Sequence, residues 1–417
     1  MPGLKAALTQ EPDGRYLQAL AQVCTRLATP AARQVLVEAV QGPGLSARAA
    51  ALRALSGYAT LLADKPLFQR LVEEEMRLAQ QLLHGMATAN TELRQALHYE
   101  LRKGHQRIFG LLMQLYERQP MMDAQRGVAH ATGERQASAL EILDNLIPRP
   151  LYQGLQAMLD VGRLSDKVQR FDDLLGPMMT SEAIQTTIVR CGTAAFSAWT
   201  VAVALRQWHP QPATVACLHP HLETTNLLIQ ESALLVLRRL PLQRPAAYDF
   251  LQALHPAVTA LLMPSSAPIS SVSAHERVLM LKGTTLFTET SENVLGTIVP
   301  IMREVSFQPE QEIFVKGTLG TSLFIVCEGE VGIFDGSRQL TAFHRGDFFG
   351  ELSLLDAEAR SATAVALTPV VAFRIDQEDF YDVMEECSEV ARNIMRVLCQ
   401  RLRRQNEKMQ PVVSVSA

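Results

Sequence analysis

The chain has 417 residues, of which 47% are hydrophobic and 20% are charged, and its formal net charge is −4. This length predicts two or three domains, each large enough to bury a core. A net charge close to zero, without a basic excess, argues against a general nucleic-acid-binding protein.

The sequence carries no sign of insertion into a membrane or of export. It has no run of about 18 apolar residues, so no transmembrane helix is predicted. The first 15 residues, MPGLKAALTQEPDGR, lack the apolar centre of a signal peptide. The six cysteines are scattered without a CxxC pair, as is typical of reduced thiols. We therefore expect a cytoplasmic protein.

One short group, Cys217-Leu-His219-Pro-His221, combines residue types that bind metals. Its spacing fits none of the common zinc patterns, and no second pair of ligands follows it. We expect the end of a helix here, with no bound metal and no cofactor elsewhere.

Residues 1 to about 263 predict one helix after another. Apolar residues recur at helical spacing, for example at Leu93, Leu97, Leu101, Ile108, Leu112 and Leu115. Asp64-Lys65-Pro66 is typical of a helix start, with a capping residue and a first-turn proline. Prolines and glycines lie between the periodic segments, as at 42–44 and 148–150. This part of the chain is therefore predicted to be α-helical.

Four helical segments in this region resemble one another, at 47–59, 135–147, 197–208 and 229–240. Each places a small residue before a leucine-rich face, which lets neighbouring helices approach closely. The intervals are irregular, so any repeat is degenerate. The pattern resembles HEAT or armadillo-type repeats over residues 129–263. For residues 1–128 a plain helical bundle is the alternative.

The character of the sequence changes at residue 264. PSSAPISSVSA, residues 264–274, is rich in serine and proline and predicts a linker. A short helix, His275 to Leu281, follows. After about residue 304 the apolar period becomes two, and Asp335-Gly336 predicts a hairpin. From Gln377 the period is helical again.

We therefore expect a multidomain α + β protein. Its C-terminal domain, residues 275–410, is predicted to be an antiparallel, jelly-roll-like β-roll with flanking helices. Residues 411–417 form a tail.

The stretch FFGELSLLDAEARSATAVA, residues 348–366, carries the candidate binding site. Gly350 permits a tight turn, and the backbone amides that follow it would bind an anion at the start of a helical turn. Arg360 adds a planar, always-charged group that matches a phosphate. The candidate residues are Gly350, Glu351, Leu352, Ser353, Arg360, Ser361 and Ala362.

Glu351 would repel a phosphate, and is better suited to accept a hydrogen bond from a sugar hydroxyl. One acid for a hydroxyl and one base for a single phosphate charge, both within an apolar roll, predict a cyclic nucleotide site. No catalytic motif accompanies it, so we do not expect an enzyme.

Residues 286–403 resemble the cyclic nucleotide-binding domain of catabolite-activator-type regulators and of protein kinase A regulatory subunits. The matching segments are 312–334, 346–366 and 377–404, of which the second resembles the phosphate-binding cassette of the family. The resemblance implies that Glu351 holds the ribose 2′-hydroxyl and that Arg360 pairs with the cyclic phosphate. It assigns the remaining phosphate contacts to the backbone amides of Leu352, Ser353 and Ala362 and to the Ser361 side chain.

Two features depart from the family pattern. The family often has aspartate after two glycines where this chain has Gly317-Thr318 and Gly320-Thr321. The residue that covers the base is not fixed by a motif, and the candidates on the final helix are Leu398, Arg401 and Leu402. Ser361, in place of a threonine that often accompanies cyclic GMP, favours cyclic AMP as ligand.

The sequence therefore predicts a regulatory sensor whose helical repeats transmit the signal to a protein partner. The alternative is a scaffold whose β-roll binds nothing. No helix-turn-helix is found after the roll, so a DNA-binding output is not expected. The arrangement resembles the soluble tail of bacterial nucleotide-translocase-like fusion proteins. The apolar face of the last helix would serve either as a lid or as the seam of a homodimer.

Overall fold

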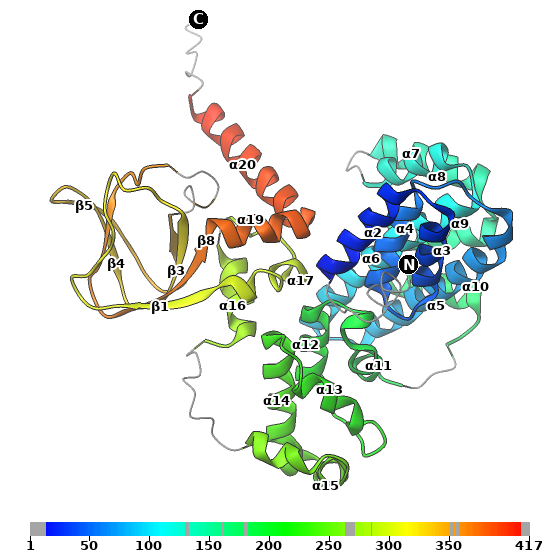
Figure 1. The fold of residues 1–417 in the computed structure, drawn as a ribbon, viewed down its shortest axis with the longest axis horizontal. Coiled ribbons are helices and arrows are strands. Elements are labelled where there is room, and N and C mark those ends of the chain that lie inside the picture. The colour runs from blue at the N-terminus through cyan, green and yellow to red at the C-terminus, as the bar shows by residue number, and fades with distance from the viewer. Residues whose placement is uncertain are drawn as a thin grey trace, which may run out of the picture. The chain divides into compact units, whose positions relative to one another are not determined.

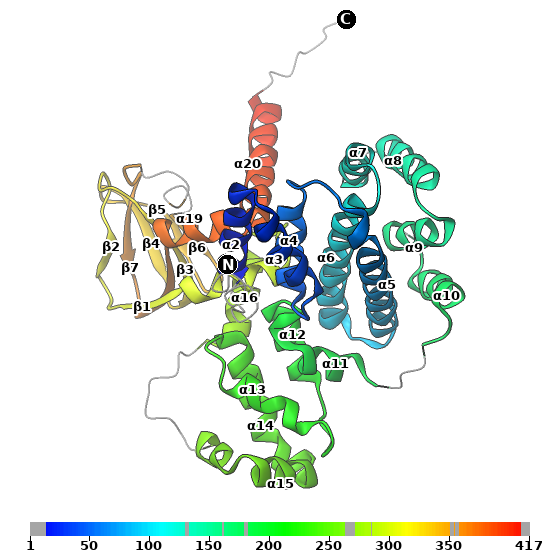
Figure 2. The same cartoon turned by 45° about the vertical axis from the view of Figure 1, so that its right-hand side comes forward.

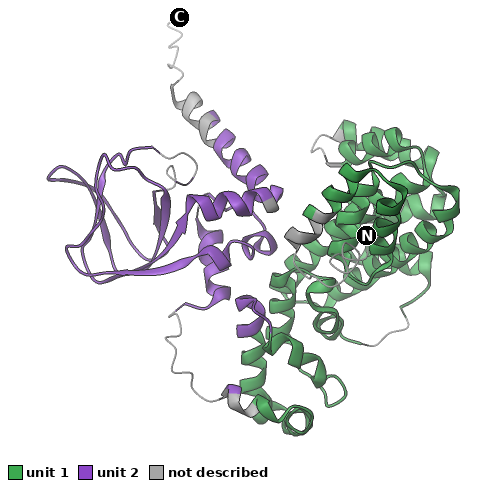
Figure 3. Cartoon of the chain, viewed as in Figure 1, with its two compact units in different colours: residues 1–223, 232–258 green, residues 224–231, 259–417 purple. Residues whose placement is uncertain are grey.

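The fold is known from a computed structural model. It describes residues 14–129, 133–160, 162–178, 182–262, 272–284, 286–350, 354 and 358–409. The chain divides into two compact units, Met1–Glu223 with Ser232–Val258, and Thr224–Glu231 with Thr259–Ala417 (Figure 3). The predicted linker, residues 264–274, lies largely outside the described residues, and the predicted domain boundaries stay predictions.

In the described residues from 14 to 262, every regular element is a helix (Figures 1 and 2). The α-helices are α2 (Gly14–Leu27), α3 (Pro30–Gln41), α4 (Leu45–Leu55), α5 (Lys65–Thr88), α6 (Thr91–Leu115), α7 (Arg118–Ala129), α8 (Gly133–Leu146), α9 (Arg149–Leu159), α10 (Leu164–Leu175), α11 (Ile184–Cys191), α12 (Ala198–Gln207), α13 (His219–Leu222), α14 (Leu227–Gln243) and α15 (Pro245–Leu254). Short 3-10 turns are η1 (Leu62–Asp64), η2 (Gly192–Ala194), η3 (Val215–Leu218) and η4 (Pro256–Leu262). The prediction of an all-helical N-terminal region is confirmed.

Successive helices pack as neighbours, and small residues allow the closest approaches. The pairs include α3 with α4, α5 with α6, α7 with α8 and α9 with α10. A Cβ atom at Gly110 in α6 would lie 3.1 Å from Leu52 in α4, and one at Gly154 in α9 would overlap Met76 in α5. A larger side chain at either position would push the helices apart. Of the described helices, none is long and apolar enough to span a bilayer.

A buried ionic cluster joins α4, α5 and α6. The Glu75 side chain is fully buried, and the side chains of Arg48 and Arg107 are each 6% exposed. Arg48 Nη1 lies 3.0 Å from Glu75 Oε1, and Arg107 Nη2 lies 2.9 Å from Oε2. Arg107 Nε donates to both oxygens. One carboxylate therefore neutralises part of the charge of two arginines in the interior of the helical unit.

A second polar contact fixes α10 to α5. Asp172 Oδ1 accepts hydrogen bonds from Gln80 Nε2 at 2.7 Å and lies 2.8 Å from His84 Nε2. Burial alone would raise the pKa of Asp172, but the hydrogen bonds from His84 and Gln80 lower it below its ordinary value. The charged carboxylate is therefore the form that holds the two helices together.

This contact predicts a pH dependence of stability. Because the folded-state pKa of Asp172 lies below the unfolded value of about 3.9, its contribution is fully present above that pH. It is lost as the pH falls through the folded-state pKa. We expect Asp172→Asn to lower the free energy of unfolding by about 1 kcal/mol at pH 6, the typical worth of such a bond. Urea unfolding at pH 6 and at pH 3 should show this difference shrink at the lower pH, and an unchanged difference would contradict the assignment.

The second unit contains α16 (Ala274–Gly283), α17 (Glu292–Leu295), η5 (Val299–Ile301) and two sheets. The start of α16 is fixed by a capping box, in which Ser273 and Glu276 satisfy one another's backbone amides. The predicted helix at His275 to Leu281 thus exists and is slightly longer than expected. The last described elements are α19 (Gln377–Glu386) and α20 (Ser388–Met409), so the predicted final helix is two helices that meet at Cys387.

The strands form two four-stranded antiparallel sheets. They are β1 (Arg303–Phe307), β2 (Glu312–Phe314), β3 (Ser322–Glu328), β4 (Val331–Asp335), β5 (Arg338–Phe343), β6 (Phe348–Phe349), β7 (Thr363–Ala366) and β8 (Val370–Asp376). The orders are β1-β8-β3-β6 and β2-β7-β4-β5. The predicted hairpin joins β4 to β5, with Gly336 at φ 59° in its turn. The prediction of an antiparallel β-roll is confirmed.

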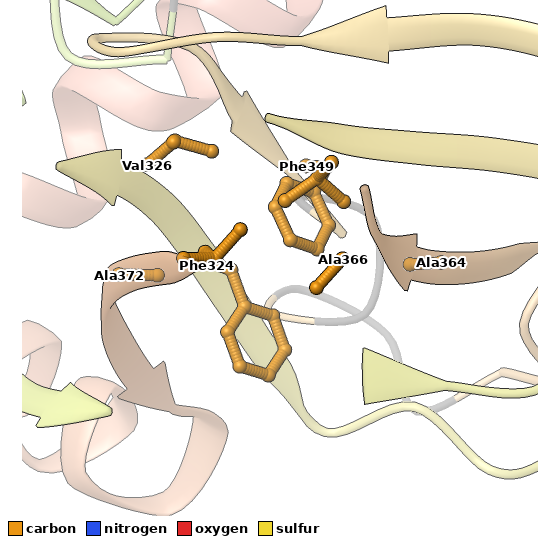
Figure 4. Close-up of a cluster of buried hydrophobic side chains, with 8 residues drawn as sticks. Phe324, Val326, Phe349, Ala364, Ala366 and Ala372 are labelled. Carbon is orange, nitrogen blue, oxygen red and sulfur yellow. The ribbon is translucent and has the colours of Figure 1, made fainter. Parts of the chain in front are cut away.

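The interior of the roll is apolar and rich in phenylalanine. Buried residues from both sheets meet there, and Figure 4 shows the labelled ones: Phe324, Val326, Phe349, Ala364, Ala366 and Ala372. The rings of Phe324 and Phe349 stack with centroids 5.3 Å apart, and the rings of Phe343 and Phe349 stack with centroids 5.7 Å apart. Alanines on β7 and β8 leave the space that these rings occupy.

Candidate functional site

The segment Glu358–Arg360 is held along the loop between β2 and β3. The backbone of Arg360 donates to Thr318 O and accepts from Gly317 N, both at 2.8 Å. Two residues before Arg360, the carbonyl of Glu358 accepts a hydrogen bond from Gly320 N at 2.9 Å. Gly317 has a φ of 84°, which a residue with a side chain rarely adopts. The backbone of Arg360 is thus fixed next to the loop that contains Gly317 and Thr318.

The Arg360 side chain turns into the roll and is 8% exposed. Its Nη2 donates to the carbonyl of Ser322, at the start of β3, at 2.9 Å. Its guanidinium carbon lies 4.1 Å from the centre of the Phe314 ring, a cation–π contact. Phe314 lies opposite Ala364 in the β2–β7 pairing.

The surroundings of Arg360 favour an added anion. Burial, and to a smaller extent the nearby Arg374, lower the pKa of Arg360. A guanidinium nevertheless keeps its proton in proteins. Arg360 therefore carries its positive charge in a buried place, and a guanidinium of this kind can pair with a phosphate.

Gly350 lies close to the Arg360 guanidinium. Its φ is 80°, and a Cβ atom built on it would lie 2.5 Å from Arg360 Nη1 and 2.9 Å from Ser322 O. Gly350 is therefore required for two reasons, the backbone conformation and the close approach of Arg360. The sequence predicted the first reason and not the second.

We expect Gly350→Ala to weaken nucleotide binding at least tenfold, because its methyl group must displace Arg360. The matched control is Gly346→Ala, where φ is 90° but nothing lies within 4 Å of the added Cβ. Both variants carry the backbone strain of roughly 1–3 kcal/mol, and only the first moves Arg360. Calorimetric titration and thermal unfolding of both variants would separate the two effects. Equal binding losses would contradict this role of Gly350.

The structure describes part of the predicted set. Gly350 and Arg360 are together, and exposed Ser361 and buried Ala362 follow Arg360 directly before β7. Glu351, Leu352 and Ser353 lie outside the described residues, so their contacts with phosphate and ribose stay predictions. Of the predicted base-covering residues, Leu398 is half-buried in α20, and the side chains of Arg401 and Leu402 are not among those described.

Sequence reasoning missed the contacts of Ser322 and Phe314 with Arg360. Phe314 belongs to the short strand EIF, whose apolar pattern indicates only that one face is buried. The pairing of β2 with β7, which starts three residues after Arg360, brings the two side chains together. Long-range pairing of this kind leaves no mark in the local sequence.

The Cys217–His221 group lies in the helical unit. His221 Nε2 is 2.7 Å from Val189 O, and the His219 ring stacks on His255 with centroids 3.6 Å apart. Among the described side chains, no group of three or more histidine, cysteine or acidic residues is placed to hold a metal.

Comparisons with known proteins find relatives of the C-terminal β-roll. Residues 304–387 match the family model described as "Cyclic nucleotide-binding domain". The chain is 30% identical over 128 residues to the cyclic AMP receptor protein of Thermus thermophilus, covering 30% of this chain and 59% of that protein. It is 30% identical over 122 residues to the cAMP-dependent protein kinase regulatory subunit of Candida albicans, covering 28% of this chain and 27% of that protein.

Among solved structures, the catabolite activator protein of Thermus thermophilus aligns with 28% identity and a TM-score of 0.27, over 30% of this chain and 62% of that one. The chain thus spans about three-fifths or less of the length of the curated relatives described above. The residues that the family model matches, 304–387, all lie in the second unit. The C-terminal part of this chain is therefore a cyclic nucleotide-binding domain, homologous to those of cyclic AMP receptors and protein kinase A regulatory subunits.

Proposed function

We propose that this chain is a regulatory protein that binds a cyclic nucleotide in its β-roll and acts on a protein partner through its helical unit. The observation that carries the proposal is the buried guanidinium of Arg360, held over Gly350 within the predicted phosphate-binding segment. Cyclic AMP is the proposed ligand, in keeping with Ser361. Relatives with 30% or more identity include cGMP-dependent protein kinases of Eimeria tenella and Toxoplasma gondii, so cyclic GMP is the competitor to test.

In the proposed mechanism, the phosphate pairs with the Arg360 guanidinium, and Glu351 accepts a hydrogen bond from the ribose 2′-hydroxyl. The ligand then draws the cassette inward, and residues 377–404 repack over the base. This changes the state of the protein only if the ligand binds one arrangement of α19 and α20 better than the other. If α20 does not act as a lid, its apolar face would form the contact surface of a homodimer.

The test is calorimetric titration of the full chain with cyclic AMP and cyclic GMP, with hydrogen exchange measured along residues 377–404. Micromolar binding of cyclic AMP with changed exchange in that segment would support the sensor. Binding without any change there would remove the lid mechanism. Absence of binding for both ligands would overturn the sensor itself.

One observation favours the alternative of a scaffold with a non-binding roll. The ring of Phe349 stacks with the rings of Phe324 and Phe343, so aromatic side chains fill this part of the interior of the roll. The same titration decides between the two functions. A roll that only supports the fold would leave the melting temperature unchanged at millimolar cyclic AMP.

We also propose that the helices over residues 129–263 form a degenerate HEAT-like array. We also propose that the protein is not an enzyme and works in the cytoplasm. Chromatography of cyclic AMP after long incubation with the protein should recover the nucleotide intact, and a hydrolysed product would contradict this proposal.

A further inference from the structure

A second arginine, Arg374 on β8, lies close to Arg360 in the roll. Successive residues of a strand point to opposite faces of the sheet, so Arg374 leaves β8 on the same face as Ala372. Ala372 belongs to the apolar interior of the roll, as does Phe324, which lies opposite Arg374 in the pairing of β3 with β8 (Figure 4). Arg374 therefore stands on the inner face of the sheet, close to the end of β8.

Hydrogen bonds connect the two arginines through Ser322 and Asp376. Arg360 Nη2 donates to Ser322 O at 2.9 Å, and Ser322 Oγ donates to Asp376 Oδ1 at 2.7 Å. Arg374 Nε donates to the same carboxylate oxygen at 2.6 Å. The pKa of Arg360 is lowered mainly by burial and also by the positive charge of Arg374, as expected for like charges that lie near each other.

Arg374 has hydrogen-bonding capacity that the protein does not use. A guanidinium carries five N–H donors. Within the described part of the chain, only Nε of Arg374 makes a hydrogen bond, and the side chain is 43% exposed. The four donors on Nη1 and Nη2 are therefore available to a ligand.

Asp376 does not depend on Arg374 alone. Its Oδ2 lies 3.6 Å from Arg303 Nη1, although Arg303 also pairs with Asp379 at 2.8 Å. Asp376 is the N-cap residue of α19, but its side chain makes no capping hydrogen bond. If Arg374 moved away, Asp376 would keep its contacts with Arg303 and Ser322 and would not be left as an unpaired charge.

We propose that Arg374 is a second phosphate-binding residue of this site, which Asp376 holds near Arg360 and releases to the ligand. A cyclic phosphate has two exocyclic oxygens that share one negative charge, and each oxygen can accept a hydrogen bond from a different guanidinium. An anion that lies near both arginines is attracted by both charges. The inference rests on the proposed function, because it assigns a further contact to the same ligand.

The experiment is calorimetric titration with cyclic AMP and with its two phosphorothioate diastereomers, in each of which sulfur replaces one exocyclic oxygen. Arg374→Gln keeps a donor for Asp376 but removes the charge, and we expect it to weaken cyclic AMP binding by about threefold or more. Sulfur is a weak hydrogen-bond acceptor. One diastereomer should therefore lose less affinity, relative to cyclic AMP, in the variant than in wild type. Arg374→Lys should recover part of the loss, and Arg338→Gln on β5 should bind as wild type does.

Asp376→Asn provides a second test. The variant can still accept a hydrogen bond from Ser322, but it no longer attracts Arg374 by charge. We expect it to raise the affinity for cyclic AMP by about twofold or more. This gain should vanish when Arg374→Gln is added. A gain that persists in the double variant would come from the removed negative charge alone and would count against the proposal.

Thermal unfolding shows whether each variant is folded. A folded Arg374→Gln protein that binds as wild type does would overturn the inference. Equal losses for cyclic AMP and both phosphorothioates would also overturn it, because they indicate a purely structural role. If Arg360→Ala loses binding while Arg374→Gln keeps it, this inference fails and the proposed function stands. If wild type binds neither cyclic AMP nor cyclic GMP, both fail.

Discussion

Replacing Arg360 with alanine should lower the affinity for cyclic AMP by about 10- to 100-fold or more. A charge-assisted hydrogen bond from a desolvated guanidinium is worth roughly 1.5–3 kcal/mol, and each 1.4 kcal/mol is a factor of ten. Arg360 is 8% exposed, so water cannot replace it at the phosphate. Calorimetric titration of wild type and variant gives the ratio directly.

Two further variants make this result specific. Arg360→Lys keeps the charge but loses the planar fork, so we expect an intermediate affinity. Arg338→Ala removes an exposed arginine from β5 of the same roll and should leave binding unchanged. Because truncation also removes the contacts with Phe314 and Ser322 O, thermal unfolding must show that the Arg360→Ala roll is folded. A folded Arg360→Ala protein that binds as wild type does would refute the site.

The sequence is sufficient to predict the helices and turns that depend on interactions between residues close together in the chain. The 3.6-residue period indicates the helical region, and Asp335-Gly336 marks the β4–β5 hairpin because glycine adopts the positive φ of that turn. The predicted phosphate-binding segment, residues 346–366, can be recognised because a close contact with an anion requires a glycine at one position and an arginine at another.

What the sequence could not predict depends on contacts between distant segments. The stacking of Arg360 on Phe314 requires the pairing of β2 with β7, and the break at Cys387 divides what the periodicity indicates as one helix. The ion cluster at Glu75 also joins residues from three helices, and any one of them alone is an ordinary charged helix residue.

That cluster gives the largest expected effect on stability. We expect Glu75→Ala to lower the free energy of unfolding of the helical unit by about 3–5 kcal/mol, the usual result of removing one partner from a buried ion pair. The variant leaves Arg48 and Arg107, each with a 6% exposed side chain, close together without the carboxylate between them.

The neighbouring residue provides the control. Glu74 also contacts Arg48, at 3.3 Å, but its side chain is 48% exposed, so Glu74→Ala should cost less than about 1 kcal/mol. The two tryptophans of the chain, Trp199 and Trp208, are both buried in the helical unit, so the change in their fluorescence during urea unfolding reports on that unit. Equal losses for the two variants would mean that water reaches Glu75. A large loss for Glu75→Ala alone would mean that the Glu75 carboxylate allows Arg48 and Arg107 to be buried together in the helical core.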